Sequence, residues 1–434
     1  MELKNDKKTI RAWAMFDWSN SAYNLVITST IFPAYYTIIT TTEEHGDKVT
    51  FFGKQFVNTA LSNYALATAY LVMALLLPIL SSTADYRGNK KIFMKLFTYL
   101  GAIACGLLFF FRLETLELGI ICFTLAAIGY IGGVLFNNSY LPEIATVDQQ
   151  DRVSAQGFAY GYVGSVLLQI ICFVFVLQPG WFGITDGSFP ARLSFLLVAV
   201  WWIVFAQIPF RKLPKGSPNY DRIRSSRVSS GFDELRKVWH QLGERQHLKK
   251  FLLAFWFYSM GVQTIMLVAA NFGEKILHLG TAKLIGIILI IQLVAIFGAY
   301  LMSSLAEKIG NIRVLLAVLS IWVVVCVCAF FITNEYEFYG LAAVVGLVMG
   351  GIQSLSRSTY SKFLPEGTPD TASFFSFYDV TEKIAIVIGL FSFAYIEEYT
   401  GNMRNSAISL SLFFLAGMAV LASLLFSGKK TGVR

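Results

Sequence analysis

Long apolar runs, separated by short charged or Gly- and Pro-containing stretches, recur along the whole chain and constrain its fold more than any other feature. Each run is long enough to cross a hydrocarbon core of about 30 Å, which needs about 20 residues of helix. Because the runs are continuously apolar rather than alternating, they predict helices and not the strands of a membrane barrel. Only 14% of the 434 residues are charged, so a water-soluble protein is excluded.

The runs predict twelve spans, near 11–40, 57–82, 91–112, 116–140, 152–178, 189–209, 250–276, 281–306, 312–332, 338–363, 371–398 and 404–427. The expected fold is an all-α integral membrane protein whose twelve transmembrane helices form two pseudo-symmetric six-helix bundles. The expected domains are an N-terminal bundle at 1–209, a cytoplasmic linker at 210–249 and a C-terminal bundle at 250–434.

The linker divides the spans six and six and has two parts. Its first part contains prolines and a Ser/Arg run, which predict an irregular connection. Its second part has an apolar helical face formed by Phe232, Leu235, Val238 and Leu242. We therefore expect an amphipathic helix on the cytoplasmic membrane surface.

The 35 Lys and Arg residues are unevenly distributed between the two sides that the spans define. They concentrate at both termini, in the loop after span 2 and in the linker, so the positive-inside rule places both termini in the cytoplasm. For a bacterial chain, this predicts a multi-pass protein of the plasma (inner) membrane. Topology and lipid headgroups then explain the net charge of +8, and no nucleic-acid partner is expected.

Matching loops in the two halves indicate an internal repeat. Ser-Ser-Thr-Ala-Asp-Tyr-Arg-Gly-Asn-Lys-Lys begins at Ser81, and Ser-Ser-Leu-Ala-Glu-Lys-Ile-Gly-Asn-Ile-Arg begins at Ser303. An acid at a helix end, a glycine at a tight bend and bases at the next helix start allow neighbouring helix ends to lock and release. We expect a gate formed by Asp85, Arg87, Gly88, Lys91, Glu307, Gly310 and Arg313. The alternative explanation is that the basic residues of these loops reflect only the positive-inside rule.

Polar side chains inside two spans are the main candidates for a substrate site, because ionisable groups are expensive in lipid. Span 1 has a polar stripe at helical spacing, formed by Asp17, Asn20, Ser21 and Asn24. Span 10 has Gln353 and Arg357 on a comparable face. We expect Asp17 and Arg357 to face the central cavity, where they pair with each other or hold the charged ends of a substrate.

Each of these charges has a structural alternative. Arg357 can tether helix-end carbonyls or Glu366 within its own half, and Asp17 can make a hydrogen bond that packs two helices. Three further amides are added to the substrate site, namely Asn137, Asn138 and Gln263. For each of them, an interhelical hydrogen bond is the alternative.

Span 11 has three charged residues in its first half, Asp379, Glu382 and Lys383. The spacing allows Asp379 to pair with Lys383 along the helix. Glu382 then becomes a carboxyl in a low-dielectric setting, which favours its protonated form. Proton coupling through Asp17, Asp379 or Glu382 is therefore one hypothesis, and a static, neutralised cluster is the other.

Residue patterns for metal, cofactor or ATP chemistry are missing from the sequence. The four histidines show no metal-ligand spacing. No phosphate-binding Gly-x-x-x-x-Gly-Lys motif occurs. We therefore expect no cofactor, no metal site and no enzymatic activity.

Three segments, at 12–23, 136–143 and 351–358, together resemble the vacuole-effluxer-like family of the major facilitator superfamily. They read Ala-Trp-Ala-Met-Phe-Asp-Trp-Ser-Asn-Ser-Ala-Tyr, Phe-Asn-Asn-Ser-Tyr-Leu-Pro-Glu and Gly-Ile-Gln-Ser-Leu-Ser-Arg-Ser. The resemblance covers essentially all twelve spans and implies a transporter of small organic solutes, because fungal members are autophagy-related vacuolar amino-acid exporters. Asp17, Asn20, Gln353 and Arg357 fall on the family pattern, whereas the three span 11 charges match it only loosely.

These observations predict a secondary active transporter that moves a small organic solute, with amino acids as the leading candidate, by alternating access and with proton coupling as an open hypothesis. An exporter of lipids or hydrophobic drug-like compounds is the alternative. The expected partners are the substrate, the lipid bilayer and protons, and the chain is expected to be a monomer. A receptor or scaffold would need a substantial soluble domain, and a membrane enzyme would need a cluster of His or acidic residues at the interface.

Overall fold

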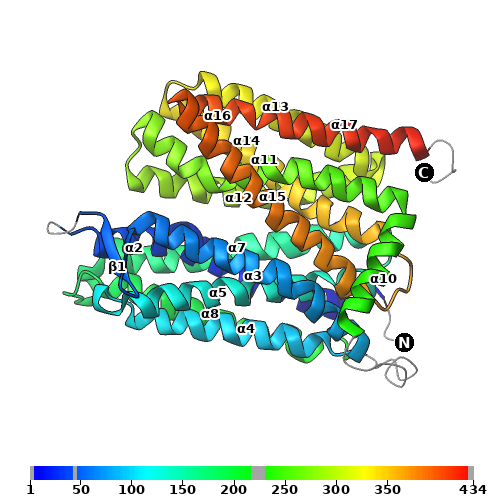
Figure 1. Ribbon diagram of the computed structural model, residues 1–434, viewed down its shortest axis with the longest axis horizontal. Coiled ribbons are helices and arrows are strands. Elements are labelled where there is room, and N and C mark those ends of the chain that lie inside the picture. Colours follow the sequence, from blue (N-terminus) through cyan, green and yellow to red (C-terminus); the bar gives the residue numbers. More distant parts are fainter. Residues whose placement is uncertain (1–3, 43–45, 217–229, 429–434) are drawn as a thin grey trace. The chain divides into compact units, whose positions relative to one another are not determined.

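The computed structural model describes residues 4–42, 46–216 and 230–428, and helices dominate them. Contacts divide the chain into two compact units. Unit 1 comprises Met1–Asp6, Asn138–Ala159 and Ser226–Arg434, and unit 2 comprises Lys7–Asn137 and Tyr160–Ser225. Figure 1 shows the helices with their labels.

The elements of unit 2 are α1 (Lys7–Ala22), the π-helix η1 (Tyr23–Ile31), α2 (Phe32–Thr40), β1 (Lys48–Phe51), β2 (Lys54–Val57), α3 (Asn58–Arg87), α4 (Lys90–Leu107), η2 (Leu108–Phe110), η3 (Leu113–Thr115), α5 (Leu116–Asn138), most of α7 (Gln150–Leu177), η4 (Pro179–Phe182) and α8 (Phe189–Lys212). The two strands form an antiparallel hairpin between the first two predicted spans.

The elements of unit 1 are the last residue of α5, α6 (Leu141–Ile144), the start of α7, α10 (Ser230–Glu244), α11 (Gln246–Leu277), α12 (Thr281–Ile309), α13 (Asn311–Phe331), α14 (Glu335–Phe363), α15 (Thr371–Thr400), α16 (Met403–Ser409) and α17 (Ser411–Gly428). The tightest packing in this unit joins α12 to α14, where Gly298, Gly346 and Gly350 allow the two backbones to approach closely.

Ten helices within the described residues are long and apolar enough to cross a membrane. They correspond to predicted spans 2 to 10 and span 12. The other two predicted spans are also helical, but the first is interrupted by η1 and the eleventh, α15, has charged residues in its first half. The chain is therefore an all-α, multi-pass membrane protein, and the number twelve stays a prediction.

The interruption of the first span has a local cause. Side-chain hydroxyls of Ser29 and Thr30 donate to the carbonyls of Asn24 and Leu25, five residues back, at 2.9 and 2.8 Å. Pro33 follows directly and removes one backbone donor from the helix. A π-helical segment inside an α-helix is frequently found at a functional site.

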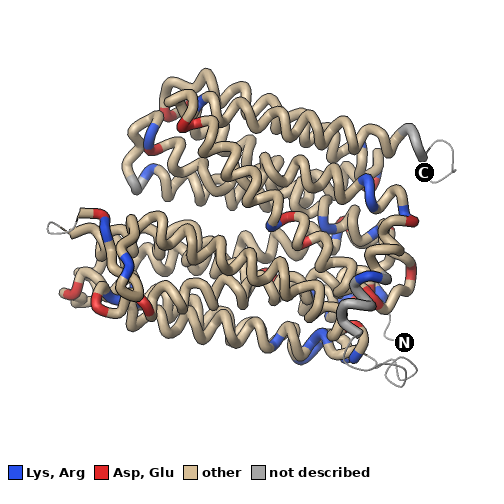
Figure 2. The backbone as a smooth tube through the Cα atoms, in the orientation of Figure 1, with Lys and Arg blue, Asp and Glu red and all other residues tan. Residues whose placement is uncertain are grey.

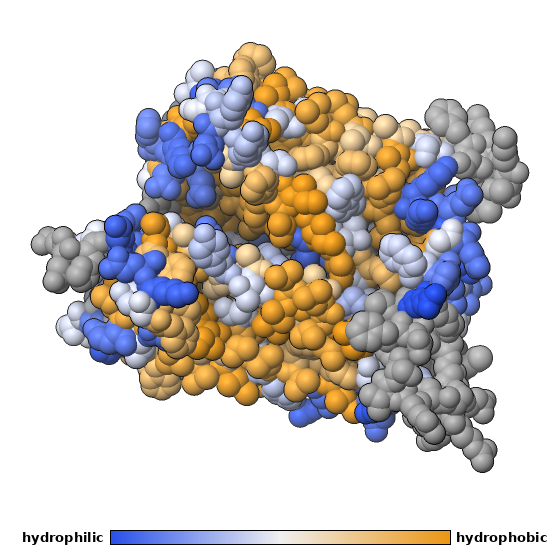
Figure 3. Space-filling view, viewed as in Figure 1, coloured by the Kyte–Doolittle hydropathy of each residue, from blue (hydrophilic) through white to orange (hydrophobic). Residues whose placement is uncertain are grey.

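The helix middles are apolar and the helix ends are charged in both units. Figure 2 shows Lys, Arg, Asp and Glu concentrated toward the helix ends. Figure 3 shows apolar residues over the helix middles that the view presents. Large apolar side chains such as Leu75 of α3 and Phe297 of α12 are exposed, as expected for helices that face lipid.

The linker helix α10 has one side buried within unit 1. Val238 and Leu242 are buried, and α10 contacts α11 and α15. Trp239 is exposed, and its ring centroid lies 5.8 Å from that of Phe377 on α15. The side chains of Phe232 and Leu235 lie outside the described residues, so the membrane-surface position of this helix stays a prediction.

Candidate functional site

Arg357 is the centre of a buried polar cluster in unit 1. It lies on α14 with only 3% of its surface exposed. Its Nε donates to Ser154 Oγ at 3.0 Å, its Nη2 to the Ser154 carbonyl at 2.8 Å and its Nη1 to Asn138 Oδ1 at 3.0 Å. The guanidinium also stacks over the Phe158 ring, 4.2 Å from its centroid. Arg357 therefore fastens segment 138–159 to α14.

A second network fastens the same segment to α13 and α14. Lys362 forms an ion pair with Asp151, whose side chain is 1% exposed. The Asn311 amide donates to Asp151 Oδ1 at 2.7 Å and lies 2.9 Å from Thr359 Oγ1. Lys362 also donates to Asn311 Oδ1 at 3.1 Å. A buried ion pair of this kind depends on such additional hydrogen bonds, because they satisfy the remaining polar atoms.

Just outside this segment's buried core, Asp148 is exposed in the loop before α7. Hydrogen bonds from Thr146 and Gln149 lower the pKa of its carboxyl below the usual value. Nearby, Thr371 at the start of α15 donates to Glu143 Oε1 at 2.9 Å. Segment 138–159 thus contacts the ends of α13, α14 and α15 at several points.

The charges of α15 form a third cluster with α11. Gln263 donates to Glu382 Oε1 at 2.9 Å, and Lys383 donates to Glu382 Oε2 at 2.6 Å. The predicted ion pair between Asp379 and Lys383 stays a prediction. Gln263 orients the Glu382 carboxylate, and the ammonium of the adjacent Lys383 reaches it there.

Asp379 is the most deeply buried acid of this cluster, with 3% of its surface exposed. Its Oδ2 has no hydrogen-bond partner among the residues that the structure describes. A buried carboxyl oxygen without a partner is costly when charged, so this environment favours a bound proton or another cation. The proton-coupling roles of Asp379 and Glu382 stay predictions.

Unit 2 contains a separate polar cluster around Asp17. Asp17 is 8% exposed on α1, and Asn137 Nδ2 donates to its Oδ1 at 3.2 Å. The Trp13 indole N–H holds the Asn137 backbone by donating to its carbonyl at 2.7 Å. The side-chain oxygens of Asn20 and Asn137 are buried and have no hydrogen-bond partner in the described part of the chain. Two amide oxygens of this cluster are therefore buried without a donor from the described residues.

The other predicted residues of span 1 and span 10 lie next to these clusters. Ser21 and Asn24 are partly buried on the first span, where Ser21 packs against Gly161 of α7. Gln353 is partly buried one turn before Arg357, and its amide lies 3.4 Å from the Met266 sulfur. None of these contacts tests whether the residues bind a substrate.

The first predicted gate loop lies in unit 2. Gly88 ends α3 with a φ of 61°. Gly216 packs so closely on the Gly88 carbonyl that a Cβ added to Gly216 would lie 2.2 Å from the carbonyl oxygen. Lys91 donates to the Leu213 carbonyl at the start of the linker. Asp85 is buried and Arg87 is exposed. The linker start therefore covers this loop.

The second predicted gate loop lies in unit 1. Gly310 separates α12 from α13 with a φ of 89°, which favours glycine. Glu307 is exposed, and Arg313 donates to the Ile309 carbonyl at 3.4 Å. The contact to segment 138–159 comes from Asn311, the repeat residue to which the sequence assigned no role. The gating function of both loops stays a prediction.

The sequence prediction named Asn138, Arg357 and the α15 charges, which the structure places in these clusters, but it did not name Asp151, Ser154 and Lys362. Their signal was weak, since the first turn of α7 and the last turn of α14 look like ordinary polar helix ends. Asp17 and Arg357 fall into different units, and their pairing stays a prediction. Within the described ranges, no group of three or more His, Cys, Asp or Glu residues is placed to hold a metal ion.

The chain is a transporter of the major facilitator superfamily, a class of membrane proteins that are not enzymes, as its family match and its relatives show. A solved proton:xylose symporter of that superfamily, XylE, superposes with a TM-score of 0.71 at 12% identity, covering 96% of this chain and 94% of XylE. At this identity, the likeness shows the fold alone.

The chain belongs to the family described as "Vacuole effluxer Atg22 like", whose model matches residues 5–431. It is 31% identical to the uncharacterized MFS-type transporter YxiO of Bacillus subtilis over 97% of this chain and 95% of YxiO. It is 27% identical to autophagy-related protein 22 of Yarrowia lipolytica over 62% of this chain. The chain spans about half the length of that fungal relative.

Proposed function

We propose that this protein is a secondary active transporter of amino acids that works by alternating access, with both termini in the cytoplasm. The observation that carries the proposal is the acceptor cluster around Asp17 in unit 2. A carboxylate and two unpartnered amide oxygens, from Asn20 and Asn137, are buried together there. The two amide oxygens and the negative charge of Asp17, which also accepts from Asn137, suit a ligand that supplies N–H donors.

An ammonium group fits this cluster because it has three donors and a positive charge. The carboxylate of Asp17 supplies the opposite charge, and the two amide oxygens accept the remaining N–H groups. Without such a ligand, the buried amide oxygens each bear a desolvation cost of about 1–3 kcal/mol. Amino acids are the class of small solute whose ammonium group this chemistry recognises, and the family resemblance points to the same class.

Within unit 1, Arg357 is proposed separately as a residue that binds carboxylate groups. In this structure, its guanidinium donates to neutral oxygens of Ser154 and Asn138. A carboxylate forms stronger, bidentate hydrogen bonds with guanidinium than neutral oxygens do. Exchange of these partners would release segment 138–159 from α14, and this links substrate binding to a conformational change.

Coupling to protons is proposed through Asp379. Its buried oxygen without a partner and the adjacent Glu382–Lys383 pair form a site at which one proton restores charge balance. Glu382 is held by Gln263 and Lys383 next to Asp379.

The experiment that tests the substrate class is a thermal-shift panel on purified protein, followed by flux of each hit in proteoliposomes. We expect stabilisation by amino acids and loss of it in Asp17→Asn, with retention in the control Asp47→Asn, which changes an exposed acid of the same unit. Stabilisation by lipids or hydrophobic drugs in place of amino acids would instead support the alternative exporter. Amino-acid flux that is unchanged in Asp17→Asn would overturn the role of this cluster.

A further inference from the structure

We propose that the β1–β2 hairpin of unit 2 docks on the phospholipid interface at the end where α3 enters the bilayer. This contact is separate from the clusters assigned to solute transport. The hairpin connects α2, which ends at Thr40, to α3, which begins at Asn58. Helix α3 is long and apolar enough to cross a membrane, so its first residues lie at a bilayer surface. Figure 1 shows β1 beside α2 at one end of the helices of unit 2.

The base of the hairpin is tied to both neighbouring helices. The Asn58 side chain is buried, and its Nδ2 donates to Thr40 Oγ1 at 3.0 Å. The Asn58 backbone N–H donates to the Asp47 carbonyl at 2.8 Å, and the Asn58 carbonyl accepts from the Tyr36 hydroxyl at 2.9 Å. These bonds join α2, the first residue of α3 and the start of the hairpin. The hairpin is therefore held at a fixed position relative to these helix ends.

The two faces of the hairpin differ in polarity. The register pairs Val49 with Phe56, and the side chains of such cross-strand partners share a face. The aromatic face has Val49, Phe51, Lys54 and Phe56. The polar face has Lys48, Thr50, Gln55 and Val57, and all four are exposed. An amphipathic element beside a bilayer turns its apolar face toward the lipid.

The aromatic face is continuous with the lipid-facing side of α3. The ring centroid of Phe56 lies 6.5 Å from that of Tyr64. Tyr64, Leu71 and Leu75 are exposed, and their spacing of seven and four residues places them on one side of the helix. Tyr64 lies only about 9 Å along the axis from Asn58, so it is near the interface, where Tyr side chains concentrate. Phe56 therefore extends the lipid-facing side of α3 onto the hairpin.

The tip of the hairpin presents a phenylalanine in a conformation that is unfavourable for it. Phe52 and Gly53 form the two-residue turn with φ of 46° and 76°, the pattern of a type I′ turn. Asn-Gly is favoured in this turn, because a bulky residue is strained at a positive φ. Phe52 is nevertheless 69% exposed, so the chain itself leaves its ring largely uncovered. A phospholipid interface would remove this ring from water.

A phospholipid matches both the apolar and the charged part of this surface. Aromatic rings concentrate at the headgroup level of a bilayer. Lys54 is exposed on the aromatic face, and a lysine stem follows apolar surface while its ammonium reaches a lipid phosphate. The hairpin thus combines exposed apolar side chains with a cation, next to a helix that enters the bilayer. This combination binds lipid at an interface.

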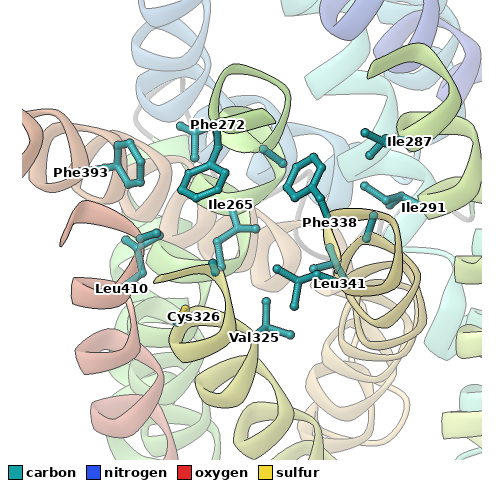
Figure 4. A pocket seen from close by; sticks show the side chains of 16 residues that line it. Ile265, Phe272, Ile287, Ile291, Val325, Cys326, Phe338, Leu341, Phe393 and Leu410 are labelled. Carbon is teal, nitrogen blue, oxygen red and sulfur yellow. The ribbon is translucent and has the colours of Figure 1, made fainter. Parts of the chain in front are cut away.

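The apolar pocket of unit 1 does not provide a comparable contact. Figure 4 shows Phe272, Phe338 and Leu341 among the side chains that line it. Its cavity of about 60 Å³ is too small for an acyl chain. The hairpin needs no cavity, because Phe52 is exposed where α3 meets the bilayer surface.

Photocrosslinking of the full-length protein in nanodiscs of phosphatidylcholine and phosphatidylglycerol tests the proposal. The photoreactive amino acid p-benzoylphenylalanine replaces one residue at a time, either Phe52 or Phe56, or else Thr50 or Gln55 of the polar face. We expect several-fold more lipid adducts from the first two positions, as measured by mass spectrometry of the hairpin peptide. Equal lipid labelling from all four positions would overturn the proposal. Crosslinks from positions 52 and 56 to another segment of this chain or to a second copy, in place of lipid, would also overturn it.

Variants at the tip separate the effect of the ring from that of the strained turn. Phe52→Asp places a charge at the interface, and we expect it to reduce lipid adducts from position 56 several-fold. Phe52→Asn should also reduce them, although Asn fits this turn better than Phe. Gln55→Asp changes the polar face and should leave the adducts unchanged. Far-UV circular dichroism and gel filtration verify that each variant is folded. Lipid adducts that both folded tip variants leave unchanged would contradict docking through Phe52.

Discussion

Arg357 holds Ser154 twice, through Nε to the side-chain oxygen at 3.0 Å and through Nη2 to the backbone carbonyl at 2.8 Å. Ser154 in turn donates to the Ser354 carbonyl of α14 at 2.8 Å. Two planar N–H groups and a stack on Phe158 thereby fix both the position and the orientation of the start of α7. This geometry requires a guanidinium.

Arg357→Lys keeps the positive charge but removes the planar guanidinium, so we expect it to impair transport nearly as much as Arg357→Ala. Breaking a buried, hydrogen-bonded charge typically costs about 3–5 kcal/mol. Both variants should therefore also unfold at lower temperature, as measured by thermal shift beside proteoliposome flux. The control Arg245→Lys changes an exposed arginine just before α11 and should leave both quantities unchanged. Normal flux in Arg357→Lys would show that transport needs neither the paired hydrogen bonds to Ser154 nor the stacking of the guanidinium on Phe158.

The Asp151–Lys362 ion pair should be coupled energetically, because both groups also share Asn311. A double-mutant cycle with Asp151→Asn and Lys362→Met should give an interaction energy of about 1–3 kcal/mol. Hydrogen exchange of segment 138–159 should be faster in each single variant. Lys249→Met, at an exposed lysine of α11, provides the control. Additive effects of the two substitutions would contradict a role for the pair in holding this segment.

Asp379→Asn should uncouple transport from protons. The neutral amide mimics the protonated carboxyl, so counterflow of the substrate should continue while its response to a pH gradient disappears. Proteoliposome uptake with and without an imposed gradient measures this difference. Glu398→Gln, at an exposed position on the same helix, should respond like the wild type. A variant that still follows the pH gradient would assign coupling to another group.

Gly164→Ala should destabilise unit 2, because a Cβ there would lie 2.6 Å from the Trp18 backbone carbonyl. The contact is to backbone, which cannot move aside as a flexible side chain does. Overpacking of this kind costs about 1–3 kcal/mol. Gly286→Ala is the matched control, since a Cβ at this helical position meets no atom within 4 Å. Thermal shift of both variants distinguishes the two cases, and equal transition temperatures would refute the predicted close packing.

Hydropathy alone predicted the helices well. The predicted spans differ from α3, α8, α11 and α13 by only a few residues at either end. The reason is that a hydrocarbon environment leaves the backbone no alternative to a helix over such a run. The π-helical segment in the first span was not predicted, because it depends on local hydroxyl-to-carbonyl bonds near Pro33 rather than on hydropathy.

The hydrogen-bond partners of the polar residues inside the spans were harder to predict than the positions of those residues. Buried charges such as Asp17, Arg357 and Asp379 are conspicuous in an apolar run. Their partners are small or amide side chains far away in sequence, as Ser154 is from Arg357. For Lys383, local spacing predicted Asp379 as a partner but not the adjacent Glu382, whose carboxylate is also held by Gln263 on another helix.

The sequence by itself determined the membrane fold, the family and the short list of polar residues inside the spans. Those properties follow from hydropathy and from the cost of charge in lipid, which act on each span separately. Only the tertiary structure decided that segment 138–159 is fastened by Arg357 and Lys362, that Asp379 holds the unpartnered oxygen and that an apolar pocket opens beside Phe338. These depend on which helix faces meet, and no single span contains that information.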